Sequence, residues 1–146
     1  MAEMPFAESA ERNTAPILEI LQREFRDRSQ VLEIGSGTGQ HAVTFAQELP
    51  HLYWQTSDLD DNHAGIRAWA EYSGLKNLGA PLSLDVRTAH VDEDAYDAAY
   101  SSNTAHIMSI DAVKKMFALL GRALRDGGVF CLYGPFQRNG ECNTQS

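Results

Sequence analysis

The residues best suited to chemistry lie in a glycine-rich stretch near the start of the chain. An apolar run at 31–34, interrupted only by Glu33, leads directly into Gly35-Ser36-Gly37-Thr38-Gly39. Alternate glycines let the backbone take positive φ angles and approach a ligand where a Cβ would collide. Thr38 and Gly39 then open a helix whose free N–H groups face the turn. The stretch predicts a ligand-binding turn between a buried strand and a helix, and a tight turn without a ligand is the alternative.

The spacing of these glycines separates two classes of ligand site. A dinucleotide-binding turn has the pattern G-x-G-x-x-G and places a pyrophosphate at the helix N-terminus. Here the pattern is G-x-G-x-G, and Glu33 lies two positions before the first glycine. This combination resembles motif I of the class I S-adenosylmethionine-dependent methyltransferases, in which the turn holds the amino-acid end of the cofactor. The resemblance implies cofactor contacts for Glu33, Gly35, Ser36, Gly37, Thr38 and Gly39, with His41 packed or hydrogen-bonded near the cofactor carboxylate.

An acidic residue follows the second predicted strand. The strand covers 52–56 and ends at Asp58, nineteen residues after Gly39. Doubly wound folds place an acid about 20 residues beyond the glycine turn on the ribose hydroxyls, because a carboxylate accepts two hydrogen bonds from a diol. Asp60 and Asp61 are neighbouring candidates for this role. Capping of the following helix is the alternative function of Asp58 or Asp60.

A third predicted strand, 81–84, ends at Asp85. Resemblance to class I methyltransferases implies that Asp85 accepts a hydrogen bond from the adenine amino group. It also implies that the backbone of Val86 contacts the edge of the adenine ring. A solvated turn aspartate is the alternative interpretation of Asp85.

The candidate catalytic residues follow the fourth and fifth predicted strands, 96–100 and 129–133. The fourth strand runs into a loop with Asn103 and His106, at the edge where open α/β sheets bind ligands. His106 is the candidate general base because imidazole titrates near neutral pH, and a structural histidine is the alternative. Asn103 could orient the substrate, accept a hydrogen bond from an amine, or contact the cofactor. Tyr133 could line the methyl-transfer site.

The order of short motifs along the chain indicates a narrower family than the class I methyltransferases as a whole. The motifs are Ser9-Ala10-Glu11-Arg12-Asn13, Leu32-Glu33-Ile34-x-Ser36-Gly37-Thr38-Gly39-Gln40-His41-Ala42, Trp54-Gln55-x-Ser57-Asp58, Pro81-Leu82-x-Leu84-Asp85-Val86, Asn103-x-x-His106 and Tyr133-Gly134-Pro135-Phe136. Together they resemble the methyltransferase-like 26 proteins and their bacterial relatives, long labelled a domain of unknown function. The resemblance covers essentially the whole chain. It implies a methyltransferase fold and S-adenosylmethionine as cofactor, with no established substrate.

Alternating strands and helices predict a single α/β domain over 1–146, with a helical region at 1–28, a cofactor-binding core at 29–136 and a tail at 137–146. We expect a three-layer, Rossmann-like class I methyltransferase sheet, mostly parallel with right-handed crossovers. A lead helix is expected from about 14 to 25, with Pro16 in its first turn. The sheet of this class has seven strands, so strands one to five are expected without the final hairpin. We therefore expect a C-terminally truncated chain whose fifth strand forms an apolar edge open to pairing or oligomerisation.

Composition and charge restrict the partners. The chain is 43% hydrophobic and 22% charged, as is usual for globular domains. No apolar run approaches the ~18 residues that span a membrane, and no secretion signal precedes the first helix, so we expect a cytoplasmic protein without a membrane partner. The two cysteines are expected to be free thiols, and no metal-ligand spacing is present. A net charge of −8 disfavours nucleic acid as a partner.

Three functions are compatible with these observations. The leading hypothesis is an S-adenosylmethionine-dependent methyltransferase acting on an unidentified acceptor, with a small molecule favoured. The second is a non-catalytic cofactor-binding domain or pseudo-methyltransferase. The third is a nicotinamide-dependent oxidoreductase, which the glycine spacing disfavours.

Overall fold

A computed structural model of the chain describes residues 4–6, 8–87, 91–102, 109–133 and 142–144. The strands are β1 Gln30–Ile34, β2 Tyr53–Asp58, β3 Leu78–Ser83, β4 Tyr96–Ser102, β5 Leu124–Tyr133 and β6 Cys142–Thr144. The helices are α1 Glu8–Glu24, α2 Gln40–Glu48, α3 His63–Ser73 and α5 Ile110–Ala123, with a 3₁₀ turn, η1 Asp60–Asn62, before α3. In this part of the chain no helix is long and apolar enough to cross a membrane.

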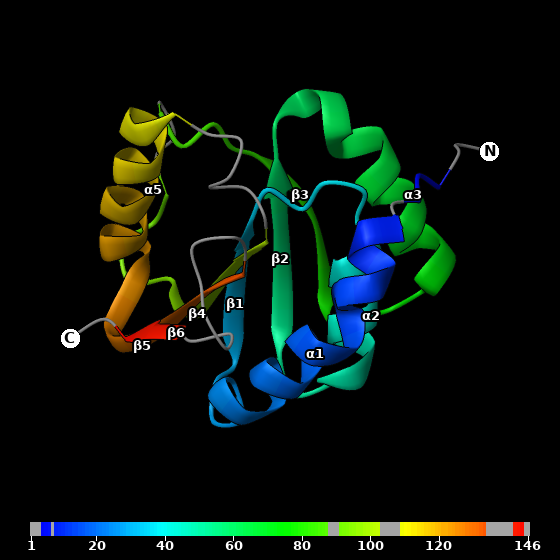
Figure 1. The fold of residues 1–146 in the computed structure, drawn as a ribbon, viewed down its shortest axis with the longest axis horizontal. Helices are drawn as coiled ribbons and strands as arrows, with labels where there is room; N and C mark the ends of the chain where they lie inside the picture. The colour runs from blue at the N-terminus through cyan, green and yellow to red at the C-terminus, as the bar shows by residue number, and fades with distance from the viewer. Residues whose placement is uncertain (1–3, 7, 88–90, 103–108, 134–141, 145–146) are drawn as a thin grey trace.

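The strands form one six-stranded sheet in the order β3-β2-β1-β4-β5-β6. Strands β1 to β5 pair in parallel, and β6 pairs antiparallel with β5. Helices α1, α2 and α3 lie on one side of the sheet and α5 lies on the other (Figure 1). The predicted three-layer, Rossmann-like methyltransferase fold is therefore confirmed.

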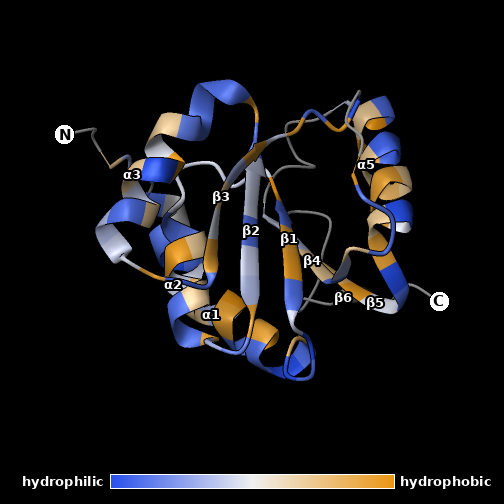
Figure 2. Ribbon diagram, turned by 180° about the vertical axis from the view of Figure 1, so that it is seen from behind, coloured by the Kyte–Doolittle hydropathy of each residue, from blue (hydrophilic) through white to orange (hydrophobic). Residues whose placement is uncertain are grey.

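The two sides of the sheet are packed by alternate residues of the same strands, because successive strand side chains point to opposite faces. We call the side under α1 and α2 the first face; its buried cluster includes Val31, Trp54, Tyr100 and Phe45. The side under α5 is the second face; its cluster includes Leu32, Ala99, Phe130 and Met116. The helices carry both hydrophobic and hydrophilic bands (Figure 2), as expected for helices with one face against a sheet.

A single carboxylate fixes the beginning of β1 against β4. Asp97 Oδ1 accepts hydrogen bonds from the backbone N–H groups of Ser29 and Gln30, at 3.1 and 2.8 Å. Asp97 Oδ2 also accepts from the Ser29 N–H, at 3.0 Å. Because β1 is short, this anchor at its beginning helps to set where its other end, the glycine turn, emerges from the sheet.

Three expectations about the elements are wrong. Helix α1 begins at Glu8, so Pro16 lies inside the helix and not in its first turn. Strand β5 does not form the sheet edge, because β6 pairs with it through Val129, Phe130 and Cys131. Cys131 is disulfide-bonded and so is not a free thiol; it lies opposite Cys142 in the register of the two strands.

Candidate functional site

The glycine turn between β1 and α2 is tied to the end of β2 by two backbone donors. The Ser36 N–H donates to the Ser57 carbonyl at 2.8 Å. The Gly37 N–H donates to Asp58 Oδ2 at 2.7 Å. These bonds bring the first predicted motif and the predicted ribose-binding acid together at the carboxyl edge of the sheet. Open α/β sheets bind their ligands at this edge.

Two glycines of the turn are required for different physical reasons. Gly37 has a φ of 60°, and a Cβ added there would meet nothing within 4 Å. Its backbone therefore faces open space, as a ligand-binding backbone must. Gly39 has a φ of 93°, and its Cβ would lie 3.0 Å from the Ile66 Cα on α3. Gly39 thus lets α3 pack closely against the turn.

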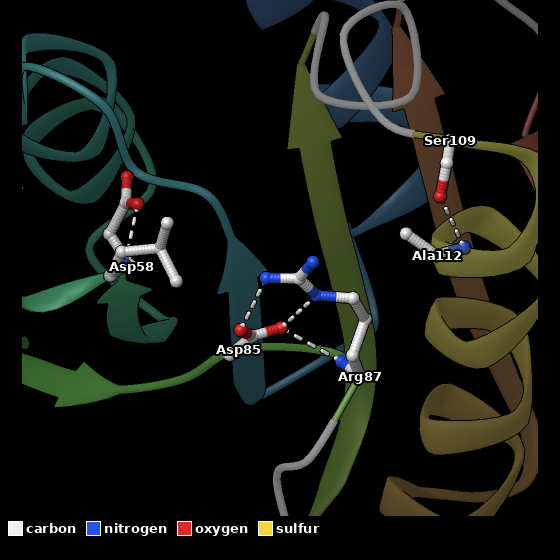
Figure 3. A network of polar contacts seen from close by, with 6 residues as sticks. Asp58, Asp85, Arg87, Ser109 and Ala112 are labelled. Atoms are coloured by element: carbon white, nitrogen blue, oxygen red, sulfur yellow. Dashed lines mark hydrogen bonds and ion pairs between the residues drawn. The ribbon is translucent and has the colours of Figure 1, made fainter.

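Asp58 is buried beneath the turn, with 8% of its surface exposed. Its Oδ2 accepts from the Gly37 N–H. Its Oδ1 accepts from the Leu59 N–H at 2.6 Å, the dashed line at Asp58 in Figure 3. Each carboxylate oxygen has a second acceptor position. The geometry is compatible with a ligand diol and also gives Asp58 a structural role in holding the turn. Ribose binding by Asp58 stays a prediction.

Glu33 lies within the first face, directly before the turn, and is 2% exposed. Its Oε1 accepts hydrogen bonds from Ser36 Oγ at 2.8 Å and from Trp54 Nε1 at 3.0 Å. Burial raises the pKa of Glu33 to about 7, with a smaller contribution from the charge of Asp58, and the two hydrogen bonds oppose the rise. Glu33 therefore supports the turn from below through Ser36. A direct contact between Glu33 and a cofactor stays a prediction.

His41 is also more buried than a surface ligand would be, with 7% exposed. Its ring packs on Phe45, with centroids 5.0 Å apart, and lies edge-on to Tyr100 at 6.5 Å. Burial raises the pKa of the Tyr100 hydroxyl above its ordinary value. The aromatic rings behind the turn thus form a layer next to the carboxyl group of Glu33.

Asp85 and Val86 follow the end of β3, the strand that pairs with β2 and its terminal Asp58. Both oxygens of Asp85 are held by Arg87: Nε donates to Oδ1 at 3.0 Å and Nη2 donates to Oδ2 at 2.9 Å (Figure 3). The Arg87 backbone N–H donates to Oδ1 as well. This fork holds the pKa of Asp85 at about 2. An adenine amino group would have to share the carboxylate with Arg87, while Val86 packs into the second-face cluster.

Of the three candidate catalytic residues, Asn103 and His106 lie outside the described residues. Tyr133 ends β5, opposite Ser102 in the register, and is half-buried against the first-face cluster. The structure therefore places Tyr133 at the carboxyl edge of the sheet. Its part in methyl transfer stays a prediction.

A cavity of about 430 Å³ opens beside the turn, lined by Pro5, Gly37, Thr38, Asp61, Asn62 and Gly65. Pro5 and Gly65 gave no signal in the sequence, because nothing in their spacing relates them to the glycine motif. The Trp54 donor could have been inferred, since a carboxyl group buried in an apolar strand requires hydrogen-bond partners. Among the residues that the structure describes, no cluster of His, Cys, Asp or Glu suits a metal ion.

The sheet order, the glycine turn after β1 and the acid after β2 define a Rossmann-like α/β fold, and methyltransferases are among the solved structures that share it. The chain is similar to the S-adenosylmethionine-dependent methyltransferase SibL in its apo form, with a TM-score of 0.74 and 19% identity over 86% of this chain and 36% of that one. It is similar to PigF with SAH, with a TM-score of 0.66 and 23% identity over 86% and 42% of the two chains. It is also similar to the [4+2]-cyclase SpnF, with a TM-score of 0.68 and 20% identity over 86% and 44%.

The particular family follows from a sequence profile that matches residues 4–146. The chain belongs to the family described as "Protein of unknown function (DUF938)". It spans less than half the length of each of the three solved structures above. One of the three is a cyclase, so the shared fold leaves the reaction open.

Proposed function

We propose that this chain binds S-adenosylmethionine at the glycine turn and takes part in methyl transfer to an unidentified acceptor, with a small molecule favoured. The carrying observation is the turn itself, which presents the open backbone of Gly37 beside Asp58 at the carboxyl edge of a methyltransferase-type sheet. The resemblance to the methyltransferase-like 26 proteins supports the same assignment.

The residues around the turn fit this cofactor in shape and charge. A Cβ at position 37 would occupy the open space that faces Gly37, and the neighbouring cavity is lined by Thr38, Asp61 and Asn62. Asp58 and Asp61 supply negative charge, which suits a ligand carrying an ammonium and a sulfonium group. The hydroxyl, carboxylate and amide groups also suit a ligand rich in hydroxyl donors.

When bound, the cofactor supplies a methyl group activated by a positively charged sulfur. The chain's own contribution is to hold and orient its ligands, because an in-line displacement gains most from proximity and alignment. Asp58 would accept hydrogen bonds from the ribose hydroxyls, and Gly37 would allow close approach. His106 is the proposed base for an acceptor that must lose a proton. Asn103 is proposed to orient the acceptor, and Tyr133 is proposed to line the methyl-transfer site.

Calorimetric titration with S-adenosylmethionine and with S-adenosylhomocysteine tests the cofactor proposal. We expect saturable binding by the wild type. Asp58→Asn should weaken it by about 1–3 kcal/mol, or about 5- to 150-fold in Kd, because one carboxylate acceptor is lost. Glu48→Gln removes the same charge from the exposed C-terminal end of α2 and should leave Kd unchanged. A folded wild type that binds neither compound contradicts the proposal.

Product assays and NADH binding, measured beside the titration, separate the other functions that the sequence left open. Binding of S-adenosylmethionine with no methylated product from any acceptor pool would support a non-catalytic cofactor-binding domain. Binding of NADH in place of both sulfur compounds, seen by nicotinamide fluorescence, would support an oxidoreductase. Methylated product from a metabolite pool would support the transferase.

A further inference from the structure

The N-terminal segment Met4–Phe6 is held against α3 next to the glycine turn by two contacts. The Trp69 indole N–H donates to the Pro5 carbonyl at 2.6 Å. A Cβ added to Gly65 would lie 2.6 Å from Pro5 Cγ and 3.0 Å from Pro5 Cδ, so the proline ring rests directly on the helix backbone. Two positions of α3, four residues apart, thus form a seat for Pro5.

The seat for Pro5 lowers the intrinsic stability of α3, because it requires a glycine within the helix. Glycine is the least favourable helix residue after proline, and Gly65 lies inside α3. The half-buried indole N–H of Trp69 takes its hydrogen-bond partner from a segment 64 residues away. Both positions of α3 therefore hold Pro5 in a defined place.

The seated segment closes one side of the cavity beside the turn. Pro5 and Gly65 line the cavity together with Gly37 and Thr38 of the turn and with Asp61 and Asn62 before α3. The same side of α3 touches the turn itself, because a Cβ at Gly39 would meet Ile66 and Trp69 at 3.0 and 3.5 Å. Helix α3 therefore connects the glycine turn to the segment.

We propose that Met4–Phe6 forms the outer wall of the ligand site, and that Gly65 and Trp69 are positioning residues which set how long a ligand stays at the glycine turn. The inference rests on the proposed function, because it concerns the same site. The polar lining of Thr38, Asp61 and Asn62 suits the part of a ligand that carries hydroxyl or ammonium groups. The wall shields that part from water.

Two substitutions loosen the wall in different ways. Trp69→Phe keeps an aromatic ring but removes the donor to Pro5 together with part of the indole ring system, so the dissociation rate constant of the ligand should rise about three- to tenfold. Gly65→Ala adds a methyl group where Pro5 now rests, and it should raise the dissociation rate constant at least as much. Gly65→Ala should also leave the melting temperature of the unliganded protein unchanged or higher, because alanine favours the helix. A merely structural defect would lower that temperature.

Each substitution has a matched control. Gly121→Ala makes the same change inside α5, where the new Cβ meets nothing within 4 Å. Tyr72→Phe removes a polar group from an exposed ring that neighbours Trp69 on α3. Both controls should leave the dissociation rate constant unchanged.

The experiment loads each purified protein with radiolabelled S-adenosylmethionine and follows the release of the label after addition of excess unlabelled S-adenosylhomocysteine. Faster release from both wall variants, with unchanged release from both controls, supports the wall. Equal release rates from wild type, Trp69→Phe and Gly65→Ala overturn the wall while leaving cofactor binding intact. A wild type that binds no label fails the proposed function itself, and the wall fails with it.

Discussion

The two faces of the sheet are built from the same strands and differ in what they bury. The first face holds a carboxyl group and its donors, Glu33, Ser36 and Trp54, beside Tyr100 and the buried His41. The second-face cluster under α5 consists of apolar residues, such as Leu32, Ile34 and Met116. The first face thus combines packing with support of the glycine turn, whereas the second face contributes packing. We expect substitutions on the two faces to differ in kind.

The largest effect on the free energy of unfolding is expected from a substitution on the second face. Met116→Ala should lower the free energy of unfolding by about 2–5 kcal/mol, because a fully buried side chain leaves a cavity. The loss should be similar at pH 5 and pH 8, and the folded fraction should bind S-adenosylmethionine with wild-type Kd. Urea denaturation at both pH values measures the loss. Lys114→Ala, at an exposed position of the same helix, should cost less than about 0.5 kcal/mol.

On the first face, Glu33→Gln should produce an effect that depends on pH. The pKa of Glu33 is about 7 in the folded protein and 4.5 in a model peptide. Between these values the folded state holds a proton that the unfolded state has lost, so wild-type stability falls as pH rises through this window. Glutamine is neutral throughout, so the variant should gain about 3 kcal/mol relative to wild type between pH 4.5 and pH 8.

Denaturation curves across this pH range, with Glu48→Gln as the charge-matched control at an exposed position, test the prediction. A constant difference between Glu33→Gln and wild type would show that the buried carboxyl group carries no titration. The contrast between the two faces would then reduce to packing alone.

The smallest effect on stability is expected from breaking the contact between Arg87 and the Asp85 carboxylate. Arg87→Ala removes both arms of the fork on Asp85, so the pKa of Asp85 should rise from about 2 toward 3.8. Carboxyl ¹³C chemical shifts followed during an acid titration measure this change. The pair is partly exposed, so thermal stability near neutral pH should change little. A fall in stability comparable to that of Met116→Ala would contradict the difference between exposed and buried groups.

Local pattern predicted most of the fold because each element carries its own signal. Apolar runs and the glycine turn, acid or polar loop that follows each of them located β1, β2 and β4, and the order of βα units predicted a parallel sheet. The start of α1 was missed because its first turn, beginning at Glu8, is polar and Pro16 suggested a later beginning. The pairing of β5 was missed because three residues of β6 carry no periodic pattern.

The sequence by itself determined the glycine turn, the acid after β2 and the βα order, because these depend on spacing along the chain. Only the tertiary structure decided which groups surround Glu33, because Trp54 reaches it from a neighbouring strand 21 residues away. It also decided that Pro5 lines the same cavity as Gly37, since the position of Pro5 depends on a glycine and an indole on α3 that have no sequence relation to the motif. Spacing predicts elements and their order, whereas burial and long-range hydrogen bonds follow from how those elements pack.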